Sequence, residues 1–275
     1  MSGPIVVKIG GRALDEADSR PGLWDALAGL ARGAPGGLAL VHGGGSAVDA
    51  HLARLGLASE RRAGLRVTPD THAEEVVAVL RGSVNTRLVG LLARRGVRAV
   101  GLGLGDGGAC RCVKHEPEGV DLGRVGRVET ADPAAGDGRL WRHLLGAGFT
   151  PVISSIGLDA GGQPLNVNAD DAACAAAQAL DAAALVLLTD VPGILDGQKR
   201  LVEEIDAPGI ERLIAEGVIA GGMIPKARAA AAAAEASGVP AVIASWDHPD
   251  RLAALARGGA AGTRIAARRR RPVGA

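Results

Sequence analysis

The chain has 275 residues, of which 47% are hydrophobic, so it can bury a substantial core without the disulfide bonds that small domains need. Its formal net charge is +1, and acidic and basic residues are interspersed, so no overall field draws it to nucleic acid or to an anionic membrane. Tyrosine is absent and Phe149 is the single phenylalanine, which argues against an aromatic platform for single-stranded nucleic acid. We therefore expect a small-molecule partner or a second copy of the chain, with no nucleic acid and no membrane.

The cysteines and the first residues of the chain indicate a reducing compartment. Cys110, Cys112 and Cys174 are an odd number with no disulfide framework around them. The apolar run Pro4–Ile9 is too short for a secretory signal, and no later segment stays apolar long enough to cross a bilayer. These features predict a cytoplasmic protein.

Short aliphatic runs alternate with longer helical patterns along the chain. The aliphatic runs are apolar on both faces, as in strands of a buried parallel sheet. They predict strands at Pro4–Ile9, Gly37–Val41, Arg98–Leu102, Thr150–Ser154, Ala184–Leu188 and Ala241–Ala244. Helix propensity and capping residues predict helices at Leu23–Arg32, Ser46–Leu55, Thr71–Arg95, Arg139–Ala147, Ala169–Leu180, Ile210–Glu216, Pro225–Ser237 and Pro249–Arg257. The alternation predicts an α/β fold, a three-layer αβα sandwich with a mainly parallel central sheet.

The stretch Cys110–Glu129 breaks this alternation and predicts a hairpin at the rim of the molecule. Its Cys110-x-Cys112-x-x-His115 spacing has the residue types of a metal site. Two thiols one residue apart on a strand point to opposite faces, however, so we assign no metal there. Cys174 lies in an alanine-rich helical pattern and is interpreted as a small core residue. The run Arg268–Arg271 is interpreted as a solvated tail.

Two glycine-rich loops follow predicted strands and are suited to an anion. Lys8-Ile9-Gly10-Gly11 ends the first strand, and His42-Gly43-Gly44-Gly45-Ser46 joins the second strand to a helix. Glycine lets the backbone approach an anion closely, and Ser46 is expected to cap a helix whose positive end adds to the field. Both loops lie at carboxyl ends of strands, where open α/β sheets bind ligands. The loops therefore predict phosphate binding.

Other nucleotide and hydrolase motifs fit the chain less well. No G-x-x-x-x-G-K-S/T is present, so the chain is not a P-loop enzyme. Gly103, Gly105 and Gly108 form a G-x-G-x-x-G, which leaves a dinucleotide-binding oxidoreductase as a distant alternative, but a strand pattern follows them where that motif needs a helix. An esterase would need a G-x-S-x-G elbow, and the chain has none.

Further polar clusters fall in the second half of the chain. Asn166-Val167-Asn168-Ala169-Asp170 is expected to open a helix, and Thr189-Asp190-Val191-Pro192-Gly193-Ile194 follows a buried strand. Gly221-Gly222-Met223-Ile224-Pro225-Lys226 brings a second lysine to a glycine-rich turn. Together these clusters predict a polar site spread over several strand ends.

These motifs, in this order and with Gly64-Leu65-Arg66-Val67-Thr68, resemble those of the amino acid kinase family from Pro4 to about Ile265. The Gly64–Thr68 and Asn166–Asp170 signatures resemble its acetylglutamate branch in particular. The resemblance implies a kinase that transfers the γ-phosphoryl group of ATP to the side-chain carboxylate of N-acetyl-L-glutamate, in arginine biosynthesis. Alternatives are another N-blocked acidic amino acid as substrate, or a non-catalytic amino-acid-binding regulatory module of the same fold.

The resemblance also implies a role for each motif residue. Lys8 and Lys226 would stabilise the transition state, Asp170 would hold both lysines, and Gly11 would offer a backbone donor. The implied substrate-binding residues are Gly44, Gly45, Arg66 and Asn166. The implied nucleotide contacts are Thr189, Asp190, Val191, Pro192, Gly193, Ile194, Val218, Ile219 and Ala220. Mg²⁺ would be carried by the ATP phosphates and water, with no dedicated protein ligands.

By the same resemblance the chain is one amino acid kinase domain over residues 1–275. Its amino-acid-substrate lobe would span about 1–181 and its nucleotide lobe about 182–266, with a basic tail over 267–275. Arginine-inhibited relatives carry an extra helix before the first strand, whereas only Met1-Ser2-Gly3 stands there in this sequence. We therefore expect a homodimer that arginine does not inhibit.

Overall fold

A mainly parallel sheet forms the centre of the structure, a computed structural model that describes residues 3–62, 64–129 and 137–267. Within those residues the sheet has eight strands in the order β12-β14-β13-β11-β1-β2-β8-β5. Their bounds are β1 Ile5–Ile9, β2 Leu38–His42, β5 Ala99–Gly103, β8 Thr150–Ser154, β11 Ala184–Thr189, β12 Glu204–Ile205, β13 Ala241–Ser245 and β14 Gly262–Ile265. The six predicted strands all belong to this sheet. The strands β12 and β14 were not predicted, and β14 pairs antiparallel with β13.

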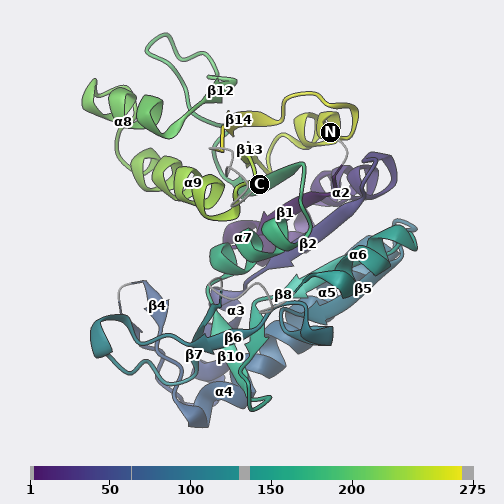
Figure 1. Ribbon diagram of the computed structural model, residues 1–275, viewed down its shortest axis with the longest axis vertical. Coiled ribbons are helices and arrows are strands. Elements are labelled where there is room, and N and C mark those ends of the chain that lie inside the picture. Colours follow the sequence, from purple (N-terminus) through teal and green to yellow (C-terminus); the bar gives the residue numbers. More distant parts are fainter. Residues whose placement is uncertain (1–2, 63, 130–136, 268–275) are drawn as a thin grey trace, which may run out of the picture.

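Helices cover both faces of the central sheet (Figure 1). On one face α2, α5 and α10 pack on Val7, Leu40 and their same-facing neighbours, and on the other α6, α7 and α9 cover the alternate strand residues. The helix bounds are α1 Arg12–Asp15, α2 Pro21–Gly33, α3 Gly45–Arg54, α4 Asp70–Val77, α5 Asn85–Ala93, α6 Arg139–Gly146, α7 Ala169–Ala179, α8 Ala207–Ala215, α9 Met223–Ser237 and α10 Pro249–Ala254. Short 3₁₀ turns lie at Ala17–Ser19, Asp106–Gly108, Pro117–Gly119 and Leu255–Arg257. These layers confirm the predicted αβα sandwich.

A smaller sheet stands beyond the carboxyl ends of the central strands. It has the order β6-β7-β10-β9, with bounds β6 Cys112–Lys114, β7 Val125–Val128, β9 Ile156–Leu158 and β10 Pro164–Val167. A two-stranded hairpin, β3 Arg61–Arg62 with β4 Leu65–Arg66, lies at the same end of the molecule, opposite α8 and α9 in Figure 1. The antiparallel pairing of β6 with β7 confirms the hairpin predicted at Cys110–Glu129.

Of two local predictions at helix starts, one is confirmed and one was wrong. The segment Asn166–Asp170 opens a helix as predicted, because α7 begins at Ala169 directly after β10, and the Asn168 side chain accepts a hydrogen bond from the Asp170 N–H at 2.7 Å. Ser46 does not cap α3. That helix begins at Gly45, and the Ser46 hydroxyl donates to the Asp15 carboxylate.

The helical stretch Asp70–Ala93 contains α4, a wide π-helical turn η2 at Ala78–Val84, and α5. By length and composition alone it could cross a membrane, contrary to the sequence-based expectation. Core helices pass the same test, and buried residues such as Leu88, Leu91 and Leu92 pack this helix into the cluster that covers the central sheet. The Arg268–Arg271 run lies outside the described residues.

Candidate active site

An open pocket lies where the carboxyl ends of the central strands meet the small sheet. The loops after β1 and β2 form one side of it, and the β3-β4 hairpin, β10 and the start of α7 form the other. Its volume is about 750 Å³ when the space open to solvent is included. It is lined by Lys8, Gly10, Gly11, Gly43, Gly44, Gly45, Val48, Arg61, Gly64, Leu65, Arg66, Leu80, Val125, Ser155, Asn166, Val167, Asn168 and Ala169. Both predicted glycine loops thus border one pocket, together with the predicted substrate residues.

Lys8 lines this pocket and forms an ion pair with Asp170. Lys8 is the fourth residue of β1, and its Nζ lies 2.9 Å from Asp170 Oδ1 in the first turn of α7. The Lys8 side chain is 19% exposed, so this cation is held at the wall of the pocket with little access to bulk water. Asp170 is therefore in contact with Lys8, and its role in catalysis stays a prediction.

Lys226 has a different carboxylate partner from the one expected. Its Nζ pairs with Asp190 Oδ1, directly after β11, and not with Asp170. This hydrogen bond from Lys226, with a second from the Thr189 hydroxyl at 2.9 Å, lowers the pKa of the Asp190 carboxyl. The two lysines therefore rest on separate carboxylates, and Lys226 is not among the residues that line the pocket.

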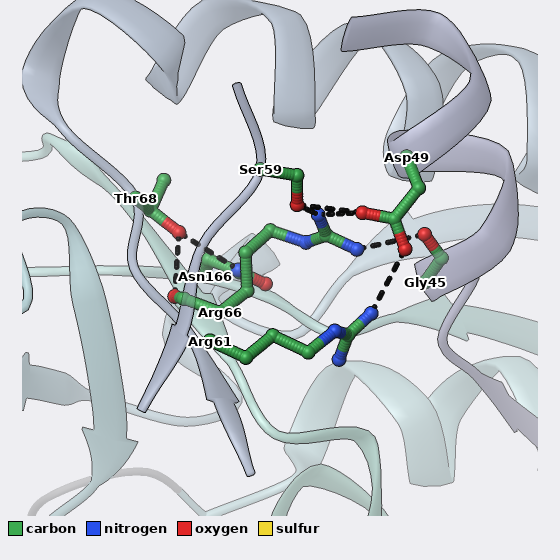
Figure 2. Close-up of polar contacts among 7 residues, drawn as sticks. All are labelled: Gly45, Asp49, Ser59, Arg61, Arg66, Thr68 and Asn166. Atoms are coloured by element: carbon green, nitrogen blue, oxygen red, sulfur yellow. Dashed lines mark hydrogen bonds and ion pairs between the residues drawn. The ribbon is translucent and has the colours of Figure 1, made fainter. Parts of the chain in front are cut away.

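Several acceptors hold Arg66, which lines the pocket (Figure 2). Its guanidinium donates to Asp49 and Ser59 through Nη1, and to the Gly45 carbonyl at 2.7 Å through Nη2. Arg61, on the same hairpin, reaches Asp49 Oδ2 at 3.0 Å. The hydrogen bond from Arg66 is the main cause that holds the pKa of the Asp49 carboxyl far below its usual range. Two arginines are thus fixed beside the pocket by one carboxylate of α3.

Asn166 projects from β10 toward the same hairpin. Its Nδ2 donates to the Thr68 hydroxyl at 3.1 Å, and that hydroxyl donates in turn to the Arg66 carbonyl (Figure 2). Thr68 is buried, so this chain of hydrogen bonds fixes the amide next to the arginine. The two residues predicted to grip the amino acid are therefore neighbours, although 100 positions separate them in the sequence.

The two glycine loops present backbone to the pocket. Gly11 has φ 53° and ψ −137°, a conformation that side-chain-bearing residues avoid. Gly44 lies under η2, where a Cβ on it would come within 2.9 Å of Leu80 Cδ2. Gly44, Gly45 and Gly11 can therefore bring peptide groups to an anion at distances that larger residues would prevent.

Some of the residues predicted to contact the nucleotide are buried in the core, and others are exposed. Ile194 and Ile219 are buried in the core beside α8 and α9, and the Ile194 N–H donates to Thr263 Oγ1 at 2.8 Å. Their side chains are therefore unavailable to a ligand, and only their backbone could contact one. Asp190 and Ala220 are exposed. Whether this segment binds ATP stays a prediction.

Cys110 and Cys112 are buried thiols, and Cys174 is half-buried. Burial raises the pKa of Cys110 to about 12 and that of Cys112 to about 11, so both are protonated at neutral pH. Over the described residues, no cluster of three or more histidine, cysteine or acidic side chains could hold a metal ion. Gly103, Gly105 and Gly108 lead into a 3₁₀ turn and then strand β6, which is not the helix that a dinucleotide-binding motif requires.

Several residues around the site escaped the sequence analysis. His42 stood in a motif without a role, and Asn85 lies in a helix with no motif at all, yet the two side chains are hydrogen-bonded under the glycine loop. The sequence analysis also gave no role to Asp49, Ser59 and Arg61, which belong to no motif. A buried polar residue in an apolar helical pattern, such as Asn85, is the one clue that the sequence offered.

The comparison with known proteins decides the family. The sequence model of the amino acid kinase family matches residues 3–245. The chain belongs to the amino acid kinase family. Acetylglutamate kinase of Vibrio cholerae serotype O1 is 46% identical over 262 residues, which are 95% of this chain and 97% of that protein. Acetylglutamate kinase of Pectobacterium carotovorum is 44% identical over 264 residues, 96% of this chain and 99% of that protein.

A solved structure extends the comparison to the fold. N-acetylglutamate synthase of Neisseria gonorrhoeae, complexed with coenzyme A and N-acetyl-glutamate, superposes with a TM-score of 0.72 at 24% identity. The match covers 97% of this chain and 60% of that one, and at this identity it speaks for the fold alone. Membership of the amino acid kinase family therefore confirms the resemblance that the motifs gave, and the central sheet is that of the family fold.

Proposed function

We propose that this chain is an N-acetyl-L-glutamate 5-kinase, which transfers the γ-phosphoryl group of ATP to the side-chain carboxylate and yields ADP and an acyl phosphate. The observation that carries the proposal is the convergence of the Lys8–Asp170 pair, both glycine loops, Arg66 and Asn166 on one pocket. The acetylglutamate kinases that match this chain over nearly its whole length support the same substrate.

The chemistry of the site suits a carboxylate that attacks a phosphoryl group. The carboxylate of the acceptor is ionised at neutral pH, so no general base is needed to create the nucleophile. The obstacle is the approach of one anion to another, and catalysis then rests on alignment and on cations that neutralise the transferring group. Lys8 supplies one such cation, and its Asp170 partner fixes where the amine points.

Lys226 would supply the second cation from the nucleotide side. Its partner Asp190 follows β11, which runs parallel to and beside β1, with Lys8 opposite Leu187. Adjacent strands lie about 4.8 Å apart. Asp190 therefore anchors Lys226 at the carboxyl ends of the central strands, next to the strand that carries Lys8. We propose that ATP phosphates lie between the two amines, with Gly11, Gly44 and Gly45 as backbone donors around the transferring group.

Arg66 and Asn166 would hold the far end of the amino acid. A guanidinium fork matches the α-carboxylate, and an amide can exchange hydrogen bonds with the acetyl-amide group. Arg66 is already oriented by Asp49 and the Gly45 carbonyl, so binding needs little reordering of this long side chain.

Three finer features belong to the same proposal. Mg²⁺ would be held by the ATP phosphates and water, and ATP would lie along residues 189–194 and 218–220. The lobes about 1–181 and 182–266 would carry the amino acid and the nucleotide respectively. The protein would act as a homodimer in the cytoplasm.

A hydroxylamine trap tests the activity, because hydroxylamine converts an acyl phosphate into a hydroxamate. We expect ATP-dependent hydroxamate with N-acetyl-L-glutamate, and far less with glutamate, aspartate or N-acetyl-aminoadipate at equal concentration. Turnover of free glutamate alone, or of the aminoadipate derivative alone, would overturn the substrate. Lys8→Met should abolish the signal, whereas Lys114→Met, an exposed lysine paired with Asp121, serves as the matched control.

A further inference from the structure

His42 lies directly under the second glycine loop and is completely buried, with 0% of its surface exposed. It is the last residue of β2, and its imidazole bridges two elements. Nδ1 lies 2.9 Å from the Gly43 carbonyl oxygen, and Nε2 lies 2.9 Å from Asn85 Nδ2 at the start of α5. None of the catalytic steps proposed above uses this histidine.

The contacts define the tautomer of His42. The Gly43 carbonyl can only accept a hydrogen bond, so Nδ1 carries the proton. Asn85 Nδ2 donates at 2.9 Å to the Val152 carbonyl as well, so it is an amide nitrogen and its second hydrogen meets the Nε2 lone pair. Both contacts are thus satisfied by a neutral ring, and burial lowers the pKa of His42 to about 4, which keeps it neutral.

The Asn85 amide packs closely against β5. A Cβ at Gly101 would lie 2.0 Å from Asn85 Oδ1, so the glycine leaves room for this amide and for nothing larger. The acceptor side of the His42 ring is therefore supported by a side chain that β5 and β8 enclose.

The hydrogen bond to Gly43 determines the direction of the next N–H group. The chain has no cis peptide among the described residues, and in a trans peptide C=O and N–H point in opposite directions. Because the Gly43 carbonyl points down to His42, the Gly44 N–H points the opposite way, and Gly44 lines the pocket. Among the described residues the Gly44 N–H has no acceptor, although Gly44 itself is buried.

We propose that His42 is a positioning residue that fixes the Gly43–Gly44 peptide so that the Gly44 N–H faces the transferring phosphoryl group and the attacking carboxylate. Glycines on both sides of this peptide leave it free to rotate, and the rotated form would aim the Gly43 carbonyl oxygen at the anions. His42 prevents that rotation without touching the substrate. This inference rests on the kinase function proposed above.

Two substitutions of similar size separate the two hydrogen bonds. In His42→Asn the amide nitrogen replaces Nδ1 and keeps the bond to Gly43, whereas in His42→Gln the longer side chain reaches Asn85 and loses Gly43. Each variant forfeits one buried hydrogen bond, so their thermal stabilities should fall by similar amounts. We expect His42→Asn to keep kcat within about threefold of the wild type, and His42→Gln to lose at least about tenfold in kcat.

A structural readout makes the test independent of the activity. Crystal structures of the two variants should show the Gly43 carbonyl in its original direction in His42→Asn and rotated in His42→Gln. An unrotated peptide in both variants, or equal kcat in both at equal stability, would overturn the inference. If the wild type forms no hydroxamate with acetylglutamate, the proposed function fails, and the direction of the Gly43 carbonyl still decides the role of His42.

Discussion

The Lys226 amine pairs with Asp190, at the end of the strand next to the one that carries Lys8. Lys8 in turn pairs with Asp170 in α7. Each cation therefore has its own carboxylate, one in a helix that covers the central sheet and the other directly after a central strand. This arrangement places two positive charges at the carboxyl ends of neighbouring central strands, and each charge is neutralised by its own carboxylate before the nucleotide binds.

Lys226→Ala should lower kcat by about 100-fold or more and leave the KM for the amino acid nearly unchanged, because the amine acts on charge that develops in the transition state. Steady-state kinetics with the hydroxamate assay measure both constants. Arg228→Ala is the matched control, since Arg228 lies two residues after Lys226 on α9 and pairs with Glu211 at the surface. A normal kcat for Lys226→Ala would contradict the role of this lysine.

Arg66→Lys should raise the KM for acetylglutamate by roughly 10- to 100-fold, because lysine cannot reproduce the forked contacts to Asp49, Ser59 and the Gly45 carbonyl. The KM for ATP should change little. Arg62→Lys, on the same hairpin but exposed and paired with Glu60, provides the comparison. Equal KM values for the two variants would show that the fork of Arg66 is not required.

Gly11→Ala should destabilise the loop after β1 by about 1–3 kcal/mol through backbone strain alone. The φ of Gly11 is 53°, and no atom lies within 4 Å of the position where a Cβ would stand, so steric overlap does not contribute. Denaturant unfolding measures the loss. Gly29→Ala, in the middle of α2 with equally open space, should instead gain about 0.5–1 kcal/mol. A neutral effect at Gly11 would mean that the loop tolerates this strain.

His42 should make the folded state sensitive to acid. Its pKa is about 4 in the folded protein and 6.5 in the unfolded chain, so between these values the unfolded chain binds a proton that the folded one does not. Stability should therefore fall as pH decreases from 7 to 5, with His42 contributing about 2 kcal/mol of the loss. His42→Asn should lack this component, whereas His143→Asn, at an exposed position of α6, should keep it. Identical pH profiles for the wild type and His42→Asn would refute the buried neutral ring.

The sequence predicted the parts of the structure that local patterns determine. All six predicted strands and the hairpin at Cys110–Glu129 are present because aliphatic runs and turn residues act over a few positions. The strand β10, which contains Asn166, was not predicted because it depends on pairing with Val125 and its neighbours, which no local pattern reveals. The strand β14 was missed for a similar reason. Its Gly262 is needed because the chain passes close to the Ile243 carbonyl at this point, and that contact is not visible in the local sequence.

The candidate site shows the same difference between contiguous motifs and contacts that join distant parts of the sequence. The glycine loops and Arg66 were found because their motifs are contiguous, and they line one pocket. The partner of Lys226 was predicted wrongly, because Asp170 and Asp190 both follow strands and only the three-dimensional arrangement distinguishes them. His42 and Asn85 are 43 positions apart, so their hydrogen bond could not be read from either motif.

The wide turn η2 changes the direction in which the side chains of the following helix point. Bonding from residue i to i+5 accommodates one residue more than a regular turn, which offsets all later side chains by about 100° around the axis. Asn85 is the first residue after η2, so its azimuth toward His42 depends on that extra residue. Removing one residue from Ala78–Val84 would leave a helix of normal appearance whose later side chains face the wrong way. An irregularity in the winding of one helix thus governs the direction of a peptide group in the site.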